Sequence, residues 1–382
     1  MYKNESVSIV IVSAYPPDVG RLSEYCKELV ESLSKILGKP LLILSDTCEA
    51  SNTQIIVRNC WKPDNIFSIL KLWLNIFRVK CRLIHFNIHL AVFGSSRLVN
   101  FLGILSIFLA KMSGKKVVTT LHNIPDAIKI DNVGLKNSLL NRIGFSIAMK
   151  ILVHSSTFIV VKVREYVKIL GQRYSAKNVK FIPHGAWFTD RTCSWKHDSP
   201  PNILFIGYLA PYKDLKRVIE IIENLRRIIP GLKLIISGLI HPNYSNKKSL
   251  PILRDILSNP NVKYLGRVPD QDIPKLVSIS RVLILPYKTS TGTSGVYHLV
   301  AALGIPVIAP PTLEFMELVK EGAGIALINL WSNNAENKVL KLLNDEKTLL
   351  NLSKKNISYA LKRKWDDIAK EYVKLYREAL KS

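Results

Sequence analysis

A loop rich in serine, threonine and glycine, between residues 288 and 295, carries the clearest chemical signal in the sequence. An apolar segment ends at Ile284-Leu285-Pro286, the loop follows, and a second apolar, helix-like run begins after Gly295. A helix that begins after such a loop presents unpaired backbone N–H groups and the positive end of its dipole, which attract anions and phosphate in particular. The stretch 288–310 contains no Asp or Glu. The loop therefore predicts a phosphate cradle without a carboxylate of its own.

Within this loop, the residue types suggest how a phosphate would be held. Ser294 is the predicted N-cap of the following helix, and Gly295 would let the backbone approach a ligand closely. Gly292 and Thr293 precede them. An ordinary capped helix entry without any ligand is the alternative interpretation.

The elements that would position the loop alternate between strands and helices in two series. The predicted strands are 7–12, 41–44, 55–57, 83–86, 116–121 and 151–154, and then 202–206, 233–237, 262–265, 282–285 and 306–309. The predicted helices are 23–37, 66–77 and 98–112, and then 215–229, 248–257 and 273–279. Short, almost wholly apolar strands between helices predict parallel sheets covered on both faces. We expect an α/β protein with two Rossmann-like, doubly wound domains facing each other across a cleft, and ligands at the carboxyl ends of the strands.

Length and composition agree with two domains. The 382 residues exceed one ordinary core, and 48% of them are hydrophobic, which is enough for two. The polar segment 187–201, which includes Asp198-Ser199-Pro200-Pro201, is the best linker candidate. We place an N-terminal domain at 1–188 and a C-terminal domain at 189–364.

The formal net charge is +25, from 54 basic and 29 acidic residues. Such a charge attracts nucleic acids, anionic lipid head groups or phosphorylated substrates, and does not choose among them. A generally solvated basic surface is the plainer interpretation. No basic segment is interleaved with aromatic residues in the way that base-stacking proteins require, which argues against a nucleic-acid partner.

Cysteine spacing, the N-terminal residues and the length of the apolar runs together predict a cytoplasmic protein. The five cysteines are scattered singly, without zinc-site spacing or the density of a disulfide scaffold. The first six residues lead into a strand-like segment without a signal-peptide layout. The apolar runs 66–77 and 101–110 are too short or too interrupted by charge to cross a bilayer, so we expect packed helices there.

Motifs along nearly the whole chain, taken in order, resemble the retaining glycosyltransferases of family four, a GT-B group that includes glycogen synthase and phosphatidylinositol mannosyltransferase. In the second half the similar segments are the strand 203–206 with the turn 207–214, Gly238 after 235–237, the segment 262–268, the acidic segment 317–324, and Trp365 within 364–376. In the first half they are the Tyr-Pro-Pro turn ending at Gly20, the strand 117–121 with His122-Asn123, and 182–185. The resemblance implies that a helix at 365–382 packs back on the N-terminal domain.

The resemblance also implies roles for particular residues. Breaking the bond between a sugar and its diphosphate places negative charge on the leaving group, so catalysis needs fixed positive potential there. The implied catalytic residues are His122 and Lys213. The implied donor diphosphate and sugar residues are Gly207, Tyr208, Lys213, Gly238, Thr291, Gly292, Thr293, Ser294 and Gly295; those at the base are Arg267 and Val268; those on the acceptor side are Gly20, Arg21 and Asn123. His184 in the Pro-His-Gly turn is expected to shape the crossing between domains.

The chain departs from the family pattern at two places. Tyr208 stands where the family usually has an arginine, so it supplies a hydrogen bond but no charge. A pair of glutamates is missing: alignment on Gly304 places Thr291 and Leu299 at their positions, and alignment on Gly295 places Gly292 and Val300 there. Sugar recognition would then use backbone amides, Thr291 or His298. Because the family glutamate positions the sugar, its loss puts the identity of the donor sugar in question more than the reaction.

Three functions remain open. The first is a cytoplasmic, metal-independent hexosyltransferase without a cofactor, whose nucleotide-sugar donor is a substrate and whose acceptor is lipid-linked or a polysaccharide. Its basic surface would contact an anionic membrane. The second is a noncatalytic, transferase-like subunit, and the third is a basic nucleic-acid-binding protein. The retained Lys213, Gly238, His122 and Thr-Ser-Gly loop favour the first.

Overall fold

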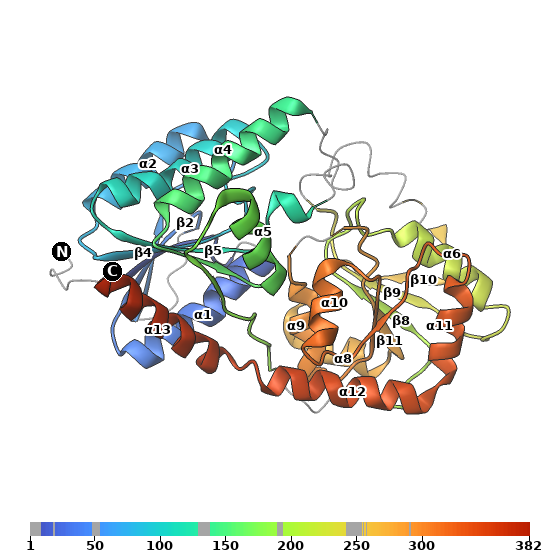
Figure 1. Cartoon of the computed structure of the whole chain (residues 1–382). Helices are drawn as coiled ribbons and strands as arrows, with labels where there is room; N and C mark the ends of the chain where they lie inside the picture. Colours follow the sequence, from blue (N-terminus) through green and yellow to red (C-terminus); the bar gives the residue numbers. More distant parts are fainter. Residues whose placement is uncertain are drawn as a thin grey trace.

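The protein consists of two layered α/β units that lie side by side (Figure 1). The computed structural model describes residues 9–17, 20–47, 54–128, 138–188, 194–241, 254, 256, 258–289 and 292–382. Thr291 and nearly all of the predicted helix 248–257 lie outside these residues.

The N-terminal unit is built on a parallel sheet of seven strands in the order β3-β2-β1-β4-β5-β6-β7. Its strands are β1 (Ile9–Val12), β2 (Leu41–Ser45), β3 (Ile55–Asn59), β4 (Leu83–Ile88), β5 (Lys116–Leu121), β6 (Phe158–Val161) and β7 (Val179–Phe181). Every residue of β1, β2 and β4 is buried. Such strands need helices on both faces of the sheet, as the sequence predicts.

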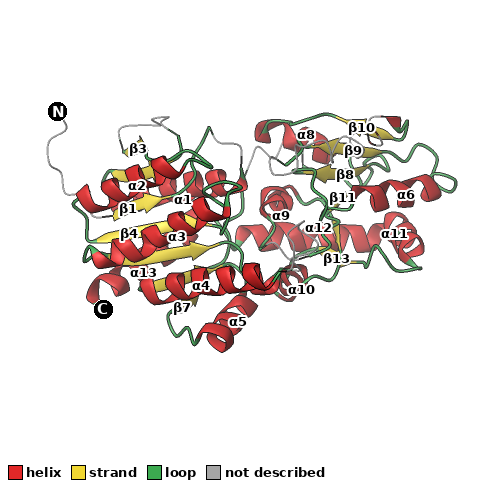
Figure 2. Ribbon diagram, turned by 90° about the horizontal axis from the view of Figure 1, so that it is seen from above, coloured by secondary structure: helices red, strands yellow, loops and turns green. Residues whose placement is uncertain are grey.

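Two groups of helices cover the two faces of this sheet (Figures 1 and 2). One face carries α1 (Arg21–Leu37) and the last helix of the chain, α13 (Trp365–Lys381). The other carries α2 (Ile66–Arg78), α3 (Arg97–Met112) and α4 (Leu139–Ser155), with α5 (Arg164–Tyr174) beside α4.

The C-terminal unit is built on a second parallel sheet, in the order β10-β9-β8-β11-β12-β13. Its strands are β8 (Ile203–Ile206), β9 (Leu234–Ser237), β10 (Val262–Tyr264), β11 (Val282–Ile284), β12 (Val307–Ala309) and β13 (Ile325–Leu327). Its described helices are α6 (Leu215–Leu225), α8 (Ile273–Ser278), α9 (Gly295–Val300), α10 (Leu313–Lys320), α11 (Ala335–Asn344) and α12 (Glu346–Leu361). Two parallel sheets with flanking helices confirm the predicted α/β class and doubly wound architecture.

One predicted strand is wrong. Residues 151–154 form the last turns of α4, and the strand that follows is β6, Phe158–Val161. A short apolar run does not distinguish a buried strand from a buried helical segment. Leu152 and Val153 are buried on the inner side of α4, which explains the apolar run.

The chain passes between the two units twice, and the two passages touch. The backbone N–H of Ala186 donates to the carbonyl of Arg363 (2.8 Å). A Cβ on Gly185 would lie 2.4 Å from the Trp365 ring, so glycine is required where the passages cross. Beyond this point α13 packs against α1, and the Tyr25 and Tyr372 hydroxyls are 3.1 Å apart. The last strand of the first sheet ends at Phe181, and the first strand of the second sheet begins at Ile203. The domain boundary at 188/189 lies between them and stays a prediction.

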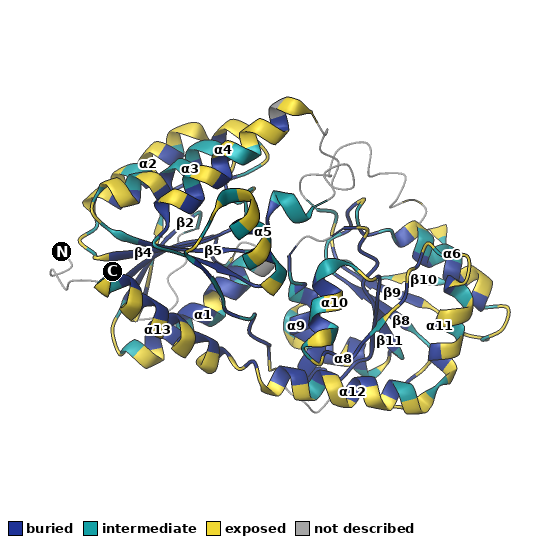
Figure 3. Cartoon of the chain, viewed as in Figure 1, coloured by how far each residue is buried: buried dark blue, intermediate teal, exposed yellow. Residues whose placement is uncertain are grey.

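Burial follows the layered plan, with dark, buried strands inside and alternating exposure on the helices (Figure 3). In the described part of the chain, none of the helices combines the length and the apolar character needed to cross a membrane.

Candidate functional site

A pocket of about 100 Å³ lies between the two units, at the carboxyl ends of β8 and β9. Its lining includes seven of the residues that the sequence singled out: Gly20, Gly207, Tyr208, Lys213, Gly238, Arg267 and Val268. Gly20 precedes α1 of the N-terminal unit, and the other six belong to the C-terminal unit. The pocket therefore lies where a doubly wound sheet places its ligands.

Two glycines form the floor of the pocket by direct backbone contact. A Cβ on Gly238 would lie 2.0 Å from the carbonyl oxygen of Gly207, so no larger residue fits without moving the backbone. Gly207 has a φ of 116°, a conformation that other residues rarely adopt. The loops after β8 and β9 are thus pressed together at these two glycines, where no side chain separates their backbones.

Lys213 brings a buried positive charge to this floor. Its side chain is only 8% exposed, and a Cβ on Gly207 would lie 3.1 Å from the Lys213 Nζ. The Nζ is 5.2 Å from the centre of the Tyr287 ring, and the two residues also form a backbone bridge. An ammonium group in a partly desolvated pocket interacts more strongly with a phosphate than one in water does.

Two histidines, one from each unit, lie near the pocket, and the sequence reasoning missed both. His241 packs edge-on against Tyr208, with ring centres 5.2 Å apart. Burial, with the charge of Lys213, lowers the pKa of His241 to about 4. Burial, with the charge of His241, lowers the pKa of His89 to about 4. Both rings are therefore neutral near pH 7 and can donate or accept hydrogen bonds without adding charge.

The Ser/Thr/Gly loop contacts the N-terminal unit at His122. Gly292 has a φ of 94°, and a Cβ there would lie 2.0 Å from the His122 carbonyl oxygen and 3.7 Å from the Asn123 Cβ. The loop and the His122-Asn123 segment are therefore brought together, as two walls of one cleft. Both lie outside the lining of the pocket that contains Lys213.

Ser294 caps α9 in the way the sequence predicts. Its side chain accepts a hydrogen bond from the backbone N–H of Tyr297 (3.3 Å) and is buried. Thr293 is held by a hydrogen bond between its Oγ1 and the Nε2 of His298 (2.9 Å). The His298 ring stacks on His184, with ring centres 4.2 Å apart, so His184 supports the loop through the crossing segment.

His122 is set in place as a neutral imidazole. Burial, together with the charge of Lys162 and the neighbouring histidines, holds the pKa of His122 well below its ordinary value. Its Nε2 donates to the Asn87 amide oxygen (2.8 Å), whose own nitrogen donates to Ser13 (2.9 Å). Because Nε2 carries the proton, Nδ1 keeps a lone pair that can accept a hydrogen bond.

A buried lysine, Lys162, lies close enough to His122 for its charge to lower the pKa of that histidine. Lys162, directly after β6, is 4% exposed, donates to the Tyr372 hydroxyl (2.8 Å), and lies over the Tyr25 ring at 4.8 Å. Burial lowers the pKa of Lys162 well below its ordinary value. Its partners come from α1 and α13, so the last helix of the chain helps to build the N-terminal wall of the cleft.

Of the remaining candidates on the acceptor side, Gly20 and Arg21 lie at the start of α1, and Asn123 follows β5. Gly20 lines the pocket, and Arg21 is the first residue of α1. Asn123 has a buried amide oxygen without a hydrogen-bond partner among the described residues. Pocket residues that the sequence analysis did not single out are Glu24, Ile206, Ser237, Leu239, Asp270 and Val296. Glu24 lies one helical turn after Gly20, which is the only sequence signal that could have found it.

Within the described ranges, no group of three His, Cys, Asp or Glu side chains could hold a metal ion. The absence of a metal from the reaction stays a prediction.

Comparison with known families agrees with this geometry. Residues 191–360 match the family model of the glycosyl transferases group 1, and this range contains the whole second sheet, with Lys213, Gly238 and the Ser/Thr/Gly loop. This part of the chain is therefore similar to the glycosyl transferases group 1. A search of curated proteins found no match.

Solved structures resemble the chain over almost its full length. Sucrose-phosphate synthase from Thermosynechococcus elongatus has a TM-score of 0.76 at 16% identity, over 97% of this chain and 98% of that one. Anabaena HepE in complex with UDP-glucose has a TM-score of 0.70 at 14% identity, over 97% and 99%. WaaG, a glycosyltransferase involved in lipopolysaccharide biosynthesis, has a TM-score of 0.65 at 12% identity, over 96% and 99%. The two-domain fold is thus that of the GT-B glycosyltransferases.

Proposed function

We propose that this protein is a retaining glycosyltransferase of family four that transfers a hexose from a nucleotide-sugar donor to a lipid-linked or polysaccharide acceptor, at the cytoplasmic face of a membrane. One observation carries the proposal. The Lys213 Nζ lies beside Gly207 in a pocket whose floor is the contact between Gly207 and Gly238. That arrangement offers positive charge and close backbone approach, which a leaving diphosphate needs.

The nucleotide occupies the C-terminal side of the pocket in this proposal. The base lies against Arg267 and Val268, and the diphosphate lies over Gly207 and Gly238 with its charge facing Lys213. The loop 292–295, which contacts His122, completes the diphosphate and sugar site. No metal and no cofactor take part, because Lys213 and the backbone N–H groups supply the positive potential.

The sugar faces the N-terminal wall. His122, neutral and oriented by Asn87, is the proposed contact for the sugar, and Asn123 and Gly20 lie on the acceptor side. The acceptor hydroxyl attacks the anomeric carbon from the face that the diphosphate leaves. The leaving phosphate oxygen accepts the hydroxyl proton, so configuration is retained without a protein nucleophile.

The first donors to test are UDP-sugars. HepE has been crystallised with UDP-glucose and with UDP and glucose, and the pneumococcal O-GlcNAc transferase GtfA with UDP and GlcNAc. These structures share the fold of this chain at low identity, so they support the choice of donor class and leave the sugar to be measured.

A noncatalytic subunit is the second candidate, and one observation favours it. Leu299, which replaces a family glutamate in the alignment on Gly304, is 1% exposed and belongs to the hydrophobic core. That position therefore cannot contact a nucleotide sugar.

Donor turnover distinguishes the two candidates. The full-length protein is incubated with a panel of UDP-, GDP- and ADP-sugars, and the released sugar is followed by proton NMR before mutarotation. We expect at least one α-linked donor to be hydrolysed slowly, with the α anomer as the first product. Release of the β anomer would refute retention, and nucleotide binding without turnover of any donor would establish the noncatalytic subunit.

A further inference from the structure

The three helices on the outer face of the N-terminal sheet expose many large apolar side chains. Half of the strongly exposed large apolar side chains in the described residues belong to α2, α3 and α4. They are Ile66, Phe67, Leu70, Leu74 and Phe77 on α2, Leu98, Phe108 and Met112 on α3, and Leu139, Ile143 and Ile147 on α4. Phe67 is 78% exposed, Leu139 74% and Met112 65%. We call these side chains the apolar face.

These exposed residues are additional to the side of each helix that packs on the sheet. In α2, Ile69, Leu72 and Ile76 are buried, while Phe67 and Leu74 point to solvent from the same helix. A surface helix of a soluble domain normally presents polar residues on its outer side. The helices α2 and α3 pack together, as do α3 and α4, so their exposed outer sides are neighbours (Figure 3).

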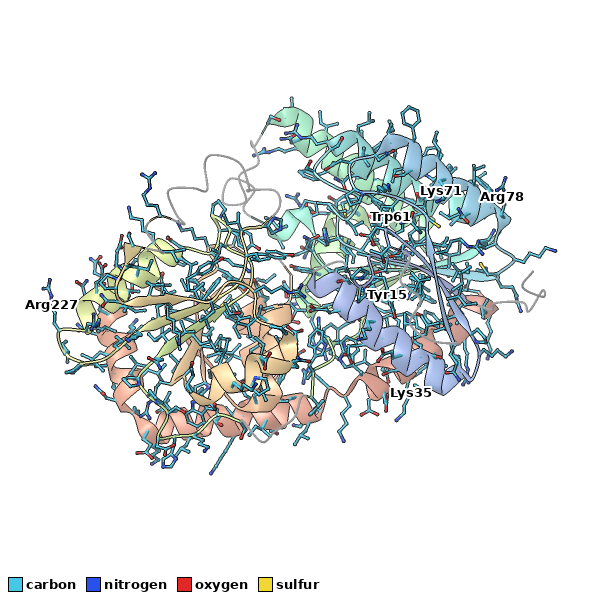
Figure 4. All side chains as sticks on the ribbon, turned by 180° about the vertical axis from the view of Figure 1, so that it is seen from behind. Tyr15, Lys35, Trp61, Lys71, Arg78 and Arg227 are labelled. Carbon is cyan, nitrogen blue, oxygen red and sulfur yellow. The ribbon has the colours of Figure 1, made fainter. Side chains whose placement is uncertain are left out.

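The charge on the same three helices has a single sign. None of the three contains an Asp or Glu. The exposed basic side chains among them are Lys71, Arg78, Arg97, Lys111, Arg142 and Lys150. Lys71 and Arg78 lie on the outer side of α2 (Figure 4). Two acidic residues that flank these helices in the described part of the chain are already engaged, since Asp64 binds Ser95 and Ser96, and Asp126 binds Arg173 and Tyr174.

The opposite face of the same sheet provides an internal comparison. There α1 and α13 carry acidic as well as basic residues, including Glu24, Asp366 and Asp367. Among the described side chains of these two helices, Ile36 is the one large apolar side chain that is strongly exposed. The combination of apolar and basic exposure is therefore a property of α2, α3 and α4, and the overall composition does not account for it.

Three of the exposed apolar residues, Phe67, Leu98 and Leu139, lie at the helix ends nearest the carboxyl edge of the sheet. In a doubly wound sheet a helix begins near the carboxyl end of the strand before it, and Phe67, Leu98 and Leu139 each lie in the first turn of their helix. The carboxyl edge of the sheet also bears His122 and faces the pocket. A partner surface that binds the first turns of α2, α3 and α4 would lie close to the acceptor side of the site.

We propose that the apolar face docks on an anionic lipid bilayer, with Phe67, Leu74 and Leu139 entering the head-group region and the basic residues contacting lipid phosphates. Apolar side chains with a basic rim and no acidic residue complement such a surface. A second copy of this chain does not, because it would bring two basic faces together. The docking itself does not depend on transferase activity, whereas delivery of a lipid-linked acceptor to the cleft rests on the proposed function.

The test is cosedimentation of the full-length protein with vesicles of phosphatidylcholine, with and without phosphatidylglycerol. The wild type should bind the anionic vesicles and lose binding as salt is raised. The triple variant Phe67→Ser, Leu74→Ser, Leu139→Ser should bind more weakly by roughly tenfold or more. The variant Lys71→Gln, Arg78→Gln should lose about tenfold on anionic vesicles only.

Matched controls change exposed residues elsewhere. Ile228→Ser, Leu350→Ser, Leu361→Ser removes apolar residues of the C-terminal unit, and Lys35→Gln, Arg227→Gln removes two exposed charges away from the face (Figure 4). Both controls should bind vesicles as the wild type does. The proposal is overturned if the triple variant binds vesicles as tightly as its control, or if the wild type does not bind anionic vesicles. It is also overturned if light scattering shows a dimer that only the triple variant abolishes. Vesicle binding without any sugar transfer would support docking and count against the proposed function alone.

Discussion

His85 shows how a single polar residue can belong to the core of the N-terminal unit. It lies in β4, fully buried, and its two ring nitrogens are 2.8 Å from Thr120 Oγ1 and 2.7 Å from the Tyr376 hydroxyl. Both nitrogens therefore have partners while the ring is neutral. Burial, with the charge of Lys162, lowers the pKa of His85 to about 3.

This shift predicts a dependence of stability on pH. Because the pKa of His85 falls from its ordinary 6.5 to about 3 on folding, the unfolded chain binds a proton more readily than the folded chain. The contribution of His85 to the free energy of unfolding is complete above pH 6.5 and is lost as the pH falls from 6.5 toward 3. At pH 5 the loss is about 2 kcal/mol.

Urea unfolding at several pH values measures the effect. The variant His85→Gln keeps a hydrogen-bonding side chain but cannot titrate, so its stability should fall by about 2 kcal/mol less than that of the wild type between pH 7 and 5. The exposed His154→Gln serves as the control. Identical pH dependence in the wild type and His85→Gln would contradict this account.

At the same scale, the sequence could predict the pocket residues that belong to one local motif. Lys213, Gly207 and Gly238 follow strands in the C-terminal unit, and each is recognisable from its own neighbours. His89 and His241 could not be found that way. The effect of His241 on the pKa of His89 arises only when the two units face one another, and no pattern near either residue records this.

At the scale of elements, the contact between the loops after β8 and β9 is the most restrictive feature of the site. Gly238→Ala would place a methyl group 2.0 Å from the Gly207 carbonyl oxygen, and a backbone atom cannot rotate away as a side chain can. The two loops must part, so we expect nucleotide affinity to fall about tenfold and stability by about 1–3 kcal/mol.

Titration with nucleotide and thermal unfolding would measure these two losses. Gly171→Ala is the matched control, because the Cβ there meets only the Ala176 carbonyl oxygen at 3.8 Å. An unchanged affinity in Gly238→Ala would show that the loops do not form the floor of the nucleotide site.

The elements themselves were largely predictable, because buried parallel strands are short apolar runs with helices between them. The alternation of 203–206, 215–229 and 233–237 corresponds to β8, α6 and β9, with α6 ending earlier, at Leu225. The prediction failed at 151–154, where four apolar residues of α4 have the composition of a strand. Periodicity over four residues cannot separate the two structures, and packing on the sheet decides between them.

At the scale of the whole molecule, contacts between distant parts of the sequence hold the two units against each other. The carboxylate of Glu317, in α10, accepts hydrogen bonds from the backbone N–H groups of Arg164 and Glu165 at the start of α5. Arg164 also binds Glu321 (3.1 Å), which in turn binds Arg363 (2.6 Å) beside the crossing to α13. The acidic segment 317–324, recognised in the sequence by its resemblance, thus joins the two units through the N-terminus of α5.

These contacts explain why the arrangement of the units was harder to predict than either unit alone. Gly292 meets His122, Glu317 meets Arg164, and Trp365 meets Gly185, and each pair is widely separated in the sequence. The resemblance could indicate two facing domains. It could not indicate that His89 and His241 would flank the pocket, or that Lys162 would be held by Tyr372 of the last helix.

The central claim is that the cleft binds a nucleoside diphosphate through Lys213. Calorimetric titration with UDP, GDP and ADP tests it most directly, with Lys213→Met compared to Lys216→Met, a change at an exposed lysine of the same segment. We predict that the wild type and Lys216→Met bind one of the nucleotides equally, and that Lys213→Met binds it at least roughly tenfold more weakly. Equal affinity in Lys213→Met, or no binding of any of the three by the wild type, would contradict the account.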